Sequence, residues 1–175
     1  MASKKLIPKL FFSSDLHIGH RNILRYSPVR AKIVGSDGDI KKHDRILIER
    51  WNSIVKPEDT VIIAGDVKLC GNVYARECIS KLHGKKILVR GNHDLSASKM
   101  MRLGFDWACD EMHINIGGTR VLISHYPYRL SSMKYYYYKT KQLFYKKEIY
   151  DFRKMHRRPV DTGMILLHGH THQED

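Results

Sequence analysis

The sequence predicts an α/β fold for a single domain of 175 residues. Three features indicate this class. Short apolar runs of strand length are bounded by Gly, Asp or Pro, and amphipathic stretches of helical length separate the first three runs. Acidic, amide or imidazole side chains follow each run. The order of strand, helix, strand, helix and strand at the start of the chain is typical of an α/β core.

The apolar runs are predicted to be buried strands, because each is short, rich in aliphatic or aromatic residues and enclosed by turn-forming residues. The segment 113–124 alternates apolar and polar residues around Gly117 and Gly118. This is the pattern of a β-hairpin and makes the second half of the chain more antiparallel. The predicted strands are residues 9–14, 60–65, 85–91, 119–125 and 163–169.

Two helices are predicted between the first three strands. Residues 40–55 form an amphipathic stretch that ends before Pro57, and residues 72–84 repeat the pattern with Gly84 as the expected C-cap. The apolar residues of the first helix recur at largely helical spacing and are Ile46, Ile48, Trp51 and Ile54. No internal repeat or linker divides the sequence, so we expect one domain over residues 1–175.

The composition is that of an ordinary globular protein except for its charge. The net charge of +13 favours polyanionic partners such as nucleic acid or phosphorylated substrates. The apolar run near the start is too short for a signal peptide or a membrane span. Cys70, Cys78 and Cys109 show no CxxC spacing, and we therefore expect reduced thiols, a cytoplasmic location and no membrane partner.

Potential metal ligands follow the predicted strands, and open α/β sheets build their sites at these carboxyl ends. Carboxylate, imidazole and amide groups without a thiolate form a nitrogen and oxygen site that suits Mn, Fe, Zn, Co or Ni. Seven ligands are too many for one tetrahedral ion. Two ions that share a carboxylate accommodate them and suit phosphoryl displacement. The seven residues are Asp15, His17, Asp66, Asn92, His125, His170 and His172.

Five short motifs carry a resemblance to a known family. They are Asp15-x-His17, Gly65-Asp66, Gly91-Asn92-His93-Asp94, His125, and Gly169-His170-x-His172. In this order the motifs resemble those of the calcineurin-like metallophosphoesterases. The longer sequence segments around the motifs are similar to those of the small bacterial and phage-type members. The matches extend over nearly the whole chain. Any one motif is weak evidence, whereas five in order are specific.

The resemblance implies a four-layer α/β/β/α sandwich with mixed sheets and a dinuclear metal site at the carboxyl ends of the strands. It implies two divalent transition-metal ions, with Mn²⁺ expected first and Fe, Ni, Co or Zn as alternatives. A metal-bridging hydroxide would attack phosphorus, His93 would protonate the leaving oxygen, and Asp94 would orient the His93 imidazole. The implied ligands are Asp15, His17 and His172 for one ion, Asn92, His125 and His170 for the other, and Asp66 as the bridge.

Further residues near the motifs have weaker assignments. His20, Arg21 and Arg90 are predicted to bind substrate phosphate, with exposed side chains or local caps as the alternative. His168 has no ligand role in the family and is expected to support the ligands. A serine hydrolase is excluded because the sequence has no G-x-S-x-G motif. Histidines outside the motifs are expected on the surface or in helices, namely His43, His83, His113 and His156.

Residues 129–158 form a basic, tyrosine-rich segment that we interpret as an insertion or cap. The segment contains ten Lys or Arg residues against two acids, and Tyr135–Tyr138 form an unbroken run. Such side chains can stack on bases and contact backbone phosphates. The alternative, which we prefer, is an amphipathic helix whose tyrosines pack on the domain. The chain ends three residues after His172, so we expect a shortened sequence or a sheet without the strand that follows in relatives.

These features predict a metal-dependent phosphoric-ester hydrolase that prefers phosphodiesters over phosphomonoesters. The expected partner is a phosphorylated substrate, such as a nucleotide or nucleic acid. The alternative is a nucleic-acid or protein-binding module on a catalytically inactive scaffold of the same family. Such relatives usually lose motif residues, and here every motif residue is present. A pure RNA-binding protein is supported by the charge but by no recognisable motif.

Overall fold

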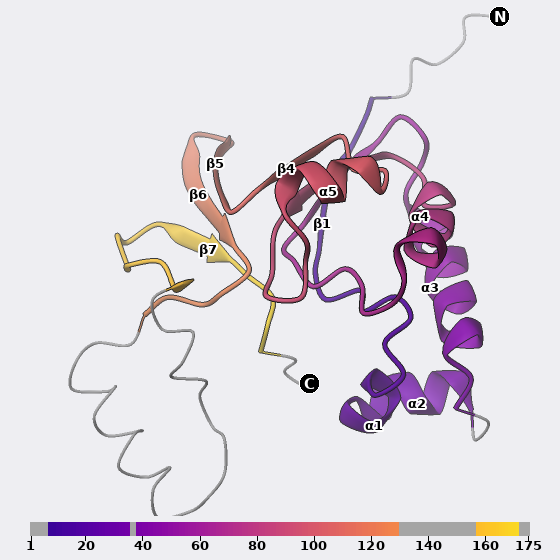
Figure 1. The fold of residues 1–175 in the computed structure, drawn as a ribbon. Helices are drawn as coiled ribbons and strands as arrows, with labels where there is room; N and C mark the ends of the chain where they lie inside the picture. The colour runs from indigo at the N-terminus through magenta and orange to yellow at the C-terminus, as the bar shows by residue number, and fades with distance from the viewer. Residues whose placement is uncertain (1–6, 36–37, 130–156, 172–175) are drawn as a thin grey trace, which may run out of the picture.

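A computed structural model of the chain describes residues 7–35, 38–129 and 157–171, and their strands form two sheets (Figure 1). The first sheet is parallel throughout, in the order β1-β2-β3-β4. The second has the order β5-β6-β7, antiparallel between β5 and β6 and parallel between β6 and β7. The α/β class is therefore confirmed. The strands are β1 (Leu10–Ser13), β2 (Thr60–Ile63), β3 (Lys85–Val89), β4 (Trp107–Cys109), β5 (Glu111–Ile116), β6 (Thr119–Ser124) and β7 (Ile165–Leu167).

Local sequence signals explain where two of the three helices between β1 and β2 begin. The Ser27 hydroxyl accepts the Arg30 backbone N–H at 3.4 Å at the start of α2, and Pro28 occupies the first turn. The Asp39 carboxylate accepts the Lys41 backbone N–H at 2.8 Å at the start of α3. The helices are α1 (Ile23–Tyr26), α2 (Pro28–Val34), α3 (Ile40–Ile54), α4 (Asn72–Ser80) and α5 (Ala97–Arg102).

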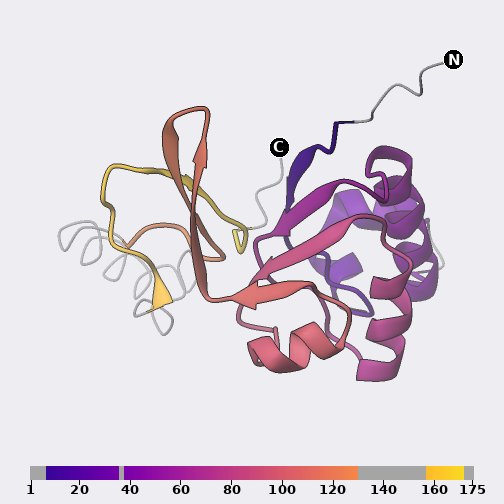
Figure 2. The ribbon, with the colours of Figure 1, turned by 90° about the horizontal axis from the view of Figure 1, so that it is seen from above.

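The parallel sheet lies between the helices and the second sheet, so its central strands are buried on both faces (Figures 1 and 2). Along β2 the side chains alternate. Val61 and Ile63 pack against α3, α4 and α5, whereas Ile62 and Ala64 pack against Ile123 of the second sheet. The described residues thus form three layers. The fourth, helical layer implied by the resemblance is not among them and stays a prediction.

Several elements differ from their predicted form. The predicted helix 72–84 ends at Ser80, and Gly84 instead turns the chain toward β3 with a φ of +81°. Ile54, expected on the apolar face of its helix, is 62% exposed at the end of α3. The elements that were not predicted are α1, α2, α5 and β4. Each spans seven residues or fewer, which is too short to show a clear period.

Most of the basic segment falls outside the described part of the chain. Residues 130–156 are not described, so the insertion or cap stays a prediction. In the described residues, no helix is long and apolar enough to cross a membrane. Cys70, Cys78 and Cys109 are free thiols.

We predict that Ile123→Ala lowers the free energy of unfolding by about 2–5 kcal/mol, because it leaves a cavity at a fully buried position between the two sheets. Ile116→Ala is the matched control, since Ile116 lies in the same hairpin but is 42% exposed. This control should change the free energy by about 0.5 kcal/mol or less. Urea unfolding in EDTA, followed by circular dichroism, measures both. Equal losses would contradict the placement of Ile123.

Candidate metal centre

The predicted ligands lie in the loops that follow the strands, and this brings residues from both sheets to one place. Parallel strands end at the same edge of a sheet, so the loops after β1, β2 and β3 are neighbours. His172 lies outside the described residues, and its ligand role stays a prediction. The others are Asp15 and His17 after β1, Asp66 after β2, Asn92 after β3, His125 after β6 and His170 after β7.

Left-handed backbone marks the same residues. Among the described residues, the non-glycine residues with positive φ are Asp15 (53°), His17 (53°), Asp66 (54°) and His170 (71°), all of them predicted ligands. This conformation costs about 1–3 kcal/mol per residue and persists only where the surroundings impose it. Here the Asp15 N–H donates to the Gly65 carbonyl at 2.9 Å. The His17 N–H donates to the Asp66 carbonyl at 3.1 Å, so the loops after β1 and β2 stay paired.

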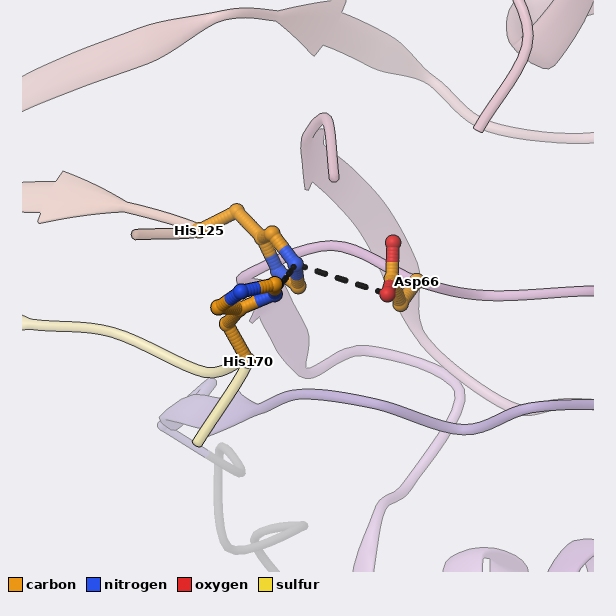
Figure 3. Close-up of side chains that lie close together, drawn as sticks. All are labelled: Asp66, His125 and His170. Carbon is orange, nitrogen blue, oxygen red and sulfur yellow. Dashed lines mark hydrogen bonds and ion pairs between the residues drawn. The ribbon is translucent and has the colours of Figure 1, made fainter. Parts of the chain in front are cut away.

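Two groups of potential ligands share the Asp66 carboxylate. One is Asp15, His17 and Asp66, and the other is Asp66, His125 and His170. Within each group the potential ligand atoms all lie within 4.8 Å of one another. Figure 3 shows the second group, in which His125 and His170 point toward Asp66 from the other sheet. A carboxylate shared by two such groups is compatible with two adjacent ions.

The fully buried His125 side chain is held in one orientation, with a proton on Nδ1. Its Nδ1 lies 2.8 Å from the Ala64 carbonyl oxygen, which can only accept, so Nδ1 carries the proton. When the imidazole is neutral, its Nε2 is therefore the nitrogen that can coordinate an ion. Nε2 lies 3.1 Å from His170 Nδ1, 3.2 Å from Asn92 Oδ1 and 3.4 Å from Asp66 Oδ2. A carbonyl behind the imidazole is a common way to orient a metal ligand.

Asp66 is held as a carboxylate at the centre of the two groups. Burial opposes its ionisation, but the hydrogen bond and charge of His125 and the His93 backbone N–H at 2.9 Å keep the pKa of Asp66 well below its usual range. Two motif glycines permit this close packing. A Cβ on Gly91 would overlap the Asp66 carboxylate, and a Cβ on Gly65 would overlap the His125 imidazole.

The Asp15 carboxylate joins the loop after β1 to the loop after β7. The His170 backbone N–H lies 3.1 Å and 3.3 Å from its two oxygens. Glycine is required next to His170, because a Cβ on Gly169 would overlap the same carboxylate. On the other side, His17 Nε2 lies 3.8 Å from Asp15 Oδ1. The loops after the first and last described strands therefore meet at this one side chain.

Comparison with known proteins identifies the family. The model of the calcineurin-like phosphoesterase superfamily domain matches residues 9–175. The chain belongs to this superfamily. The gene 66 proteins of Mycobacterium phages L5 and D29 are 31% and 30% identical to it, each over 93% of this chain and over 76% and 78% of their own lengths. The crystal structure of AQ665 of Aquifex aeolicus, titled a protein of unknown function, is 28% identical with a TM-score of 0.60, over 94% of this chain and 80% of its own.

His93 and Asp94 of this calcineurin-like domain have different surroundings. The His93 side chain is 41% exposed, and its Nε2 lies 3.8 Å from Asp66 Oδ2. Asp94 Oδ2 accepts the backbone N–H groups of Asp66 at 2.9 Å and Gly91 at 2.8 Å, and Oδ1 accepts that of Val67 at 3.0 Å. Among the described contacts of Asp94, none reaches the His93 imidazole. Asp94 thus anchors the loops after β2 and β3, and its predicted role in orienting the His93 imidazole stays a prediction.

His20 and Arg21 lie next to the ligand groups. His20 Nδ1 is 3.3 Å from His17 Nδ1, and its ring centroid is 6.4 Å from that of His93. Both residues line a hollow of about 530 Å³ beside the centre. Their predicted contact with substrate is compatible with this position and stays a prediction.

Arg90 and His168 make contacts away from the ligand atoms. The Arg90 guanidinium pairs with the Asp110 carboxylate and donates to the Leu95 carbonyl at 3.0 Å. These contacts join the loop after β3 to Asp110, which follows β4, and they engage the group that was predicted to bind phosphate. The exposed His168 lies with Nδ1 2.8 Å from the Gly169 carbonyl, and no described contact joins it to a ligand side chain.

The sequence interpretation missed a buried polar cluster beside the loop after β1. It consists of Arg30, His43 and Asp44. His43 lies in a helix, which was one of its expected positions, but its side chain is buried and only 6% exposed. The spacing of residues in the sequence did contain a signal for this burial. His43 and Asp44 precede the core-facing Leu47 and Ile48 by one helical turn, so they occupy the buried face of α3.

We predict that Gly91→Ala weakens Mn²⁺ binding by about 10- to 100-fold, because its Cβ would displace the Asp66 carboxylate. Gly71→Ala is the matched control, since a Cβ at Gly71 meets nothing within 4 Å. The control should bind Mn²⁺ as the wild type does. Isothermal titration calorimetry of EDTA-treated protein measures the affinity. If the two variants bound Mn²⁺ equally, the close packing of Gly91 against Asp66 would be wrong.

Proposed function

We propose that the protein is a metal-dependent phosphoric-ester hydrolase that prefers phosphodiesters over phosphomonoesters. The observation that carries the proposal is the buried Asp66 carboxylate, which two ligand groups share beside the exposed His93 imidazole. Two adjacent ions can stabilise both the attacking and the leaving oxygen of a phosphoryl group. Membership of the calcineurin-like phosphoesterase superfamily supports the same reaction class.

The donor set fits two divalent transition-metal ions. It offers carboxylate, imidazole and amide groups, which suit Mn²⁺, Fe, Co, Ni or Zn, and we propose Mn²⁺ first. Bound there, the ions would supply positive charge to the phosphoryl group and lower the pKa of an attacking water. The proposed ligands are Asp15, His17 and His172 for one ion, Asn92, His125 and His170 for the other, and Asp66 for both.

His93 would act as the general acid that protonates the leaving oxygen. Its backbone N–H is held by Asp66 Oδ1 at 2.9 Å, while its side chain is 41% exposed. The imidazole is therefore fixed at its base and open to a substrate. A positioned proton donor typically contributes about 10²–10⁴-fold to the rate. Asp94 would support this role by holding the Gly91 N–H at the start of the same loop.

The hollow beside His20 and the charge of the chain support an anionic substrate with an organic group. Arg21 and Lys41 line the hollow and could contact a second phosphate, while Leu69 and Tyr74 offer apolar surface to a base. The net charge of +13 would speed the encounter with any anionic ester. A nucleotide or nucleic-acid diester fits both features. The basic segment 129–158, as a cap over such a substrate, belongs to the same proposal.

A binding module on an inactive scaffold is the second candidate, and the net charge of +13 favours it. The site argues against it. Each predicted ligand in the described part of the chain stands beside another ligand, and His93 is present next to them. A protein that only binds anions has no need for such convergence.

We predict that the wild type hydrolyses bis-p-nitrophenyl phosphate faster than p-nitrophenyl phosphate, with Mn²⁺ and not with EDTA. His93→Ala should lower kcat on a thymidine dinucleotide by about 10²–10⁴-fold, because its alkoxide leaving group needs a proton. The loss on bis-p-nitrophenyl phosphate should be smaller, because p-nitrophenolate leaves without protonation. Release of p-nitrophenol and chromatography of the nucleosides measure the two rates.

His113→Ala is the control, since His113 is an exposed histidine of β5 whose imidazole pairs with Glu111 at 3.1 Å. It should keep the wild-type rates. Equal losses on both substrates in His93→Ala would contradict the general-acid role. A wild type that binds two ions but hydrolyses neither ester would favour the binding module.

A further inference from the structure

A buried polar cluster outside the ligand set lies against the loop 15–19. Arg30 comes from α2, and His43 and Asp44 come from α3. Asp44 is 1% exposed, His43 is 6% exposed, and Arg30 is partly buried. Their contacts lead to the backbone of the loop that carries Asp15 and His17. Ionisable groups at this depth are rare unless they are paired, so the cluster needs an explanation.

The Arg30 guanidinium bridges two successive carbonyl groups of the loop. Its Nη2 donates to the Asp15 carbonyl at 2.6 Å, and its Nη1 donates to the Leu16 carbonyl at 3.0 Å. Asp15 and Leu16 are only 7% and 4% exposed, so these carbonyls have little access to water. The Asp15 N–H meanwhile donates to the Gly65 carbonyl at 2.9 Å. Arg30 therefore holds the loop on one side and the β2 loop holds it on the other.

His43 and Asp44 fix the position of the Arg30 side chain. Arg30 Nη1 lies 3.3 Å from His43 Nε2, and because a guanidinium can only donate, this nitrogen accepts. His43 Nδ1 then carries the proton and donates to Asp44 Oδ1 at 2.9 Å. The hydrogen bonds thus have a single consistent direction, from Arg30 through His43 to Asp44.

Asp44 also reaches the far end of the loop. Its Oδ2 accepts the Gly19 backbone N–H at 2.9 Å and the Tyr74 hydroxyl at 2.9 Å. Burial and the neighbouring Asp44 carboxylate raise the pKa of Tyr74, so its hydroxyl remains a donor. Both ends of the loop 15–19 are therefore attached to one connected set of side chains on α2 and α3.

We propose that Arg30, His43 and Asp44, here termed the loop clamp, position the loop 15–19 for the metal ion that Asp15 and His17 would hold. The proposal rests on the proposed function only in requiring a divalent ion at this group. The left-handed backbone of Asp15 and His17 costs about 1–3 kcal/mol per residue, so without the clamp the loop has a reason to relax. Relaxation would separate the carboxylate and imidazole that must meet one ion.

The charge of Arg30 and its place in the loop clamp predict opposite effects of its removal on metal affinity. Burial lowers the pKa of Arg30 while Asp15 and Asp44 oppose this, and the group stays a cation at neutral pH. A cation beside a metal site repels the ion, so by charge alone its removal would strengthen metal binding. As part of the loop clamp, its removal weakens metal binding. The sign of the change therefore separates the two roles.

The experiment is Mn²⁺ titration of EDTA-treated protein by calorimetry, for wild type, Arg30→Met, Arg30→Lys and Lys32→Met. Arg30→Met is expected to weaken one of the two Mn²⁺ binding steps by about 10- to 100-fold and to leave the other unchanged. Arg30→Lys keeps the charge but not the planar fork, and it should weaken the same step. Lys32→Met removes an equal charge from an exposed position of α2 and should bind as the wild type does.

Near-ultraviolet circular dichroism and thermal unfolding of the metal-free proteins identify variants that do not fold. If Arg30→Met does not fold, the Mn²⁺ affinity of Arg30→Lys tests the proposal. Wild-type affinity at both steps in the Arg30 variants would overturn the loop clamp and leave the hydrolase intact. Tighter Mn²⁺ binding by Arg30→Met would also overturn the loop clamp, and it would mean that the charge of Arg30 acts mainly by repelling the ion. A wild type without Mn²⁺ binding would overturn the clamp together with the metal site. Normal binding without hydrolysis would count against the proposed function alone.

Discussion

The backbone pairing between the loops after β1 and β2 is the interaction on which the candidate site depends. The two strands pair in register from Leu10 and Thr60 onward, and the hydrogen bonds continue past the strand ends into the loops. The backbone there is left-handed, which interrupts the alternation of a strand and brings Asp15, His17 and Asp66 within reach of one another. Backbone groups, rather than the ligands, therefore hold the first ligand group in place.

Much of the site could be predicted because its motifs report local geometry. A carboxylate or imidazole directly after a buried strand must lie at the sheet edge, and Asp66 and His125 do so. The contacts of Asp94 and Arg90 could not be predicted in the same way. Their partners are mostly backbone groups and a carboxylate brought close by folding, and a sequence does not indicate which of these lie within reach.

The helices and strands likewise divide into those that a local sequence pattern predicts and those that only tertiary contacts determine. The long helix α3 was predicted because its apolar residues repeat over several turns. The central strands were predicted because they are continuous apolar runs bounded by turn-forming residues. The short α1, α2 and β4 have no measurable period, and tertiary packing decides their conformation. The loop clamp was missed for a related reason. Its polar residues on the inner face of α3 are satisfied by Arg30 of α2, which belongs to a helix that the sequence did not predict.

The hydrogen bond from His170 to the Asp15 carboxylate joins residues 155 positions apart in the chain. During synthesis the ribosome therefore exposes Asp15, His17 and Asp66 well before it exposes His170. A nascent chain that has not reached residue 170 lacks one member of the second ligand group. Contacts of such long range also form late in folding, because a large loop must close first. Completion of the second ligand group is thus coupled to the synthesis of residue 170, and chains that terminate before this residue cannot assemble that group.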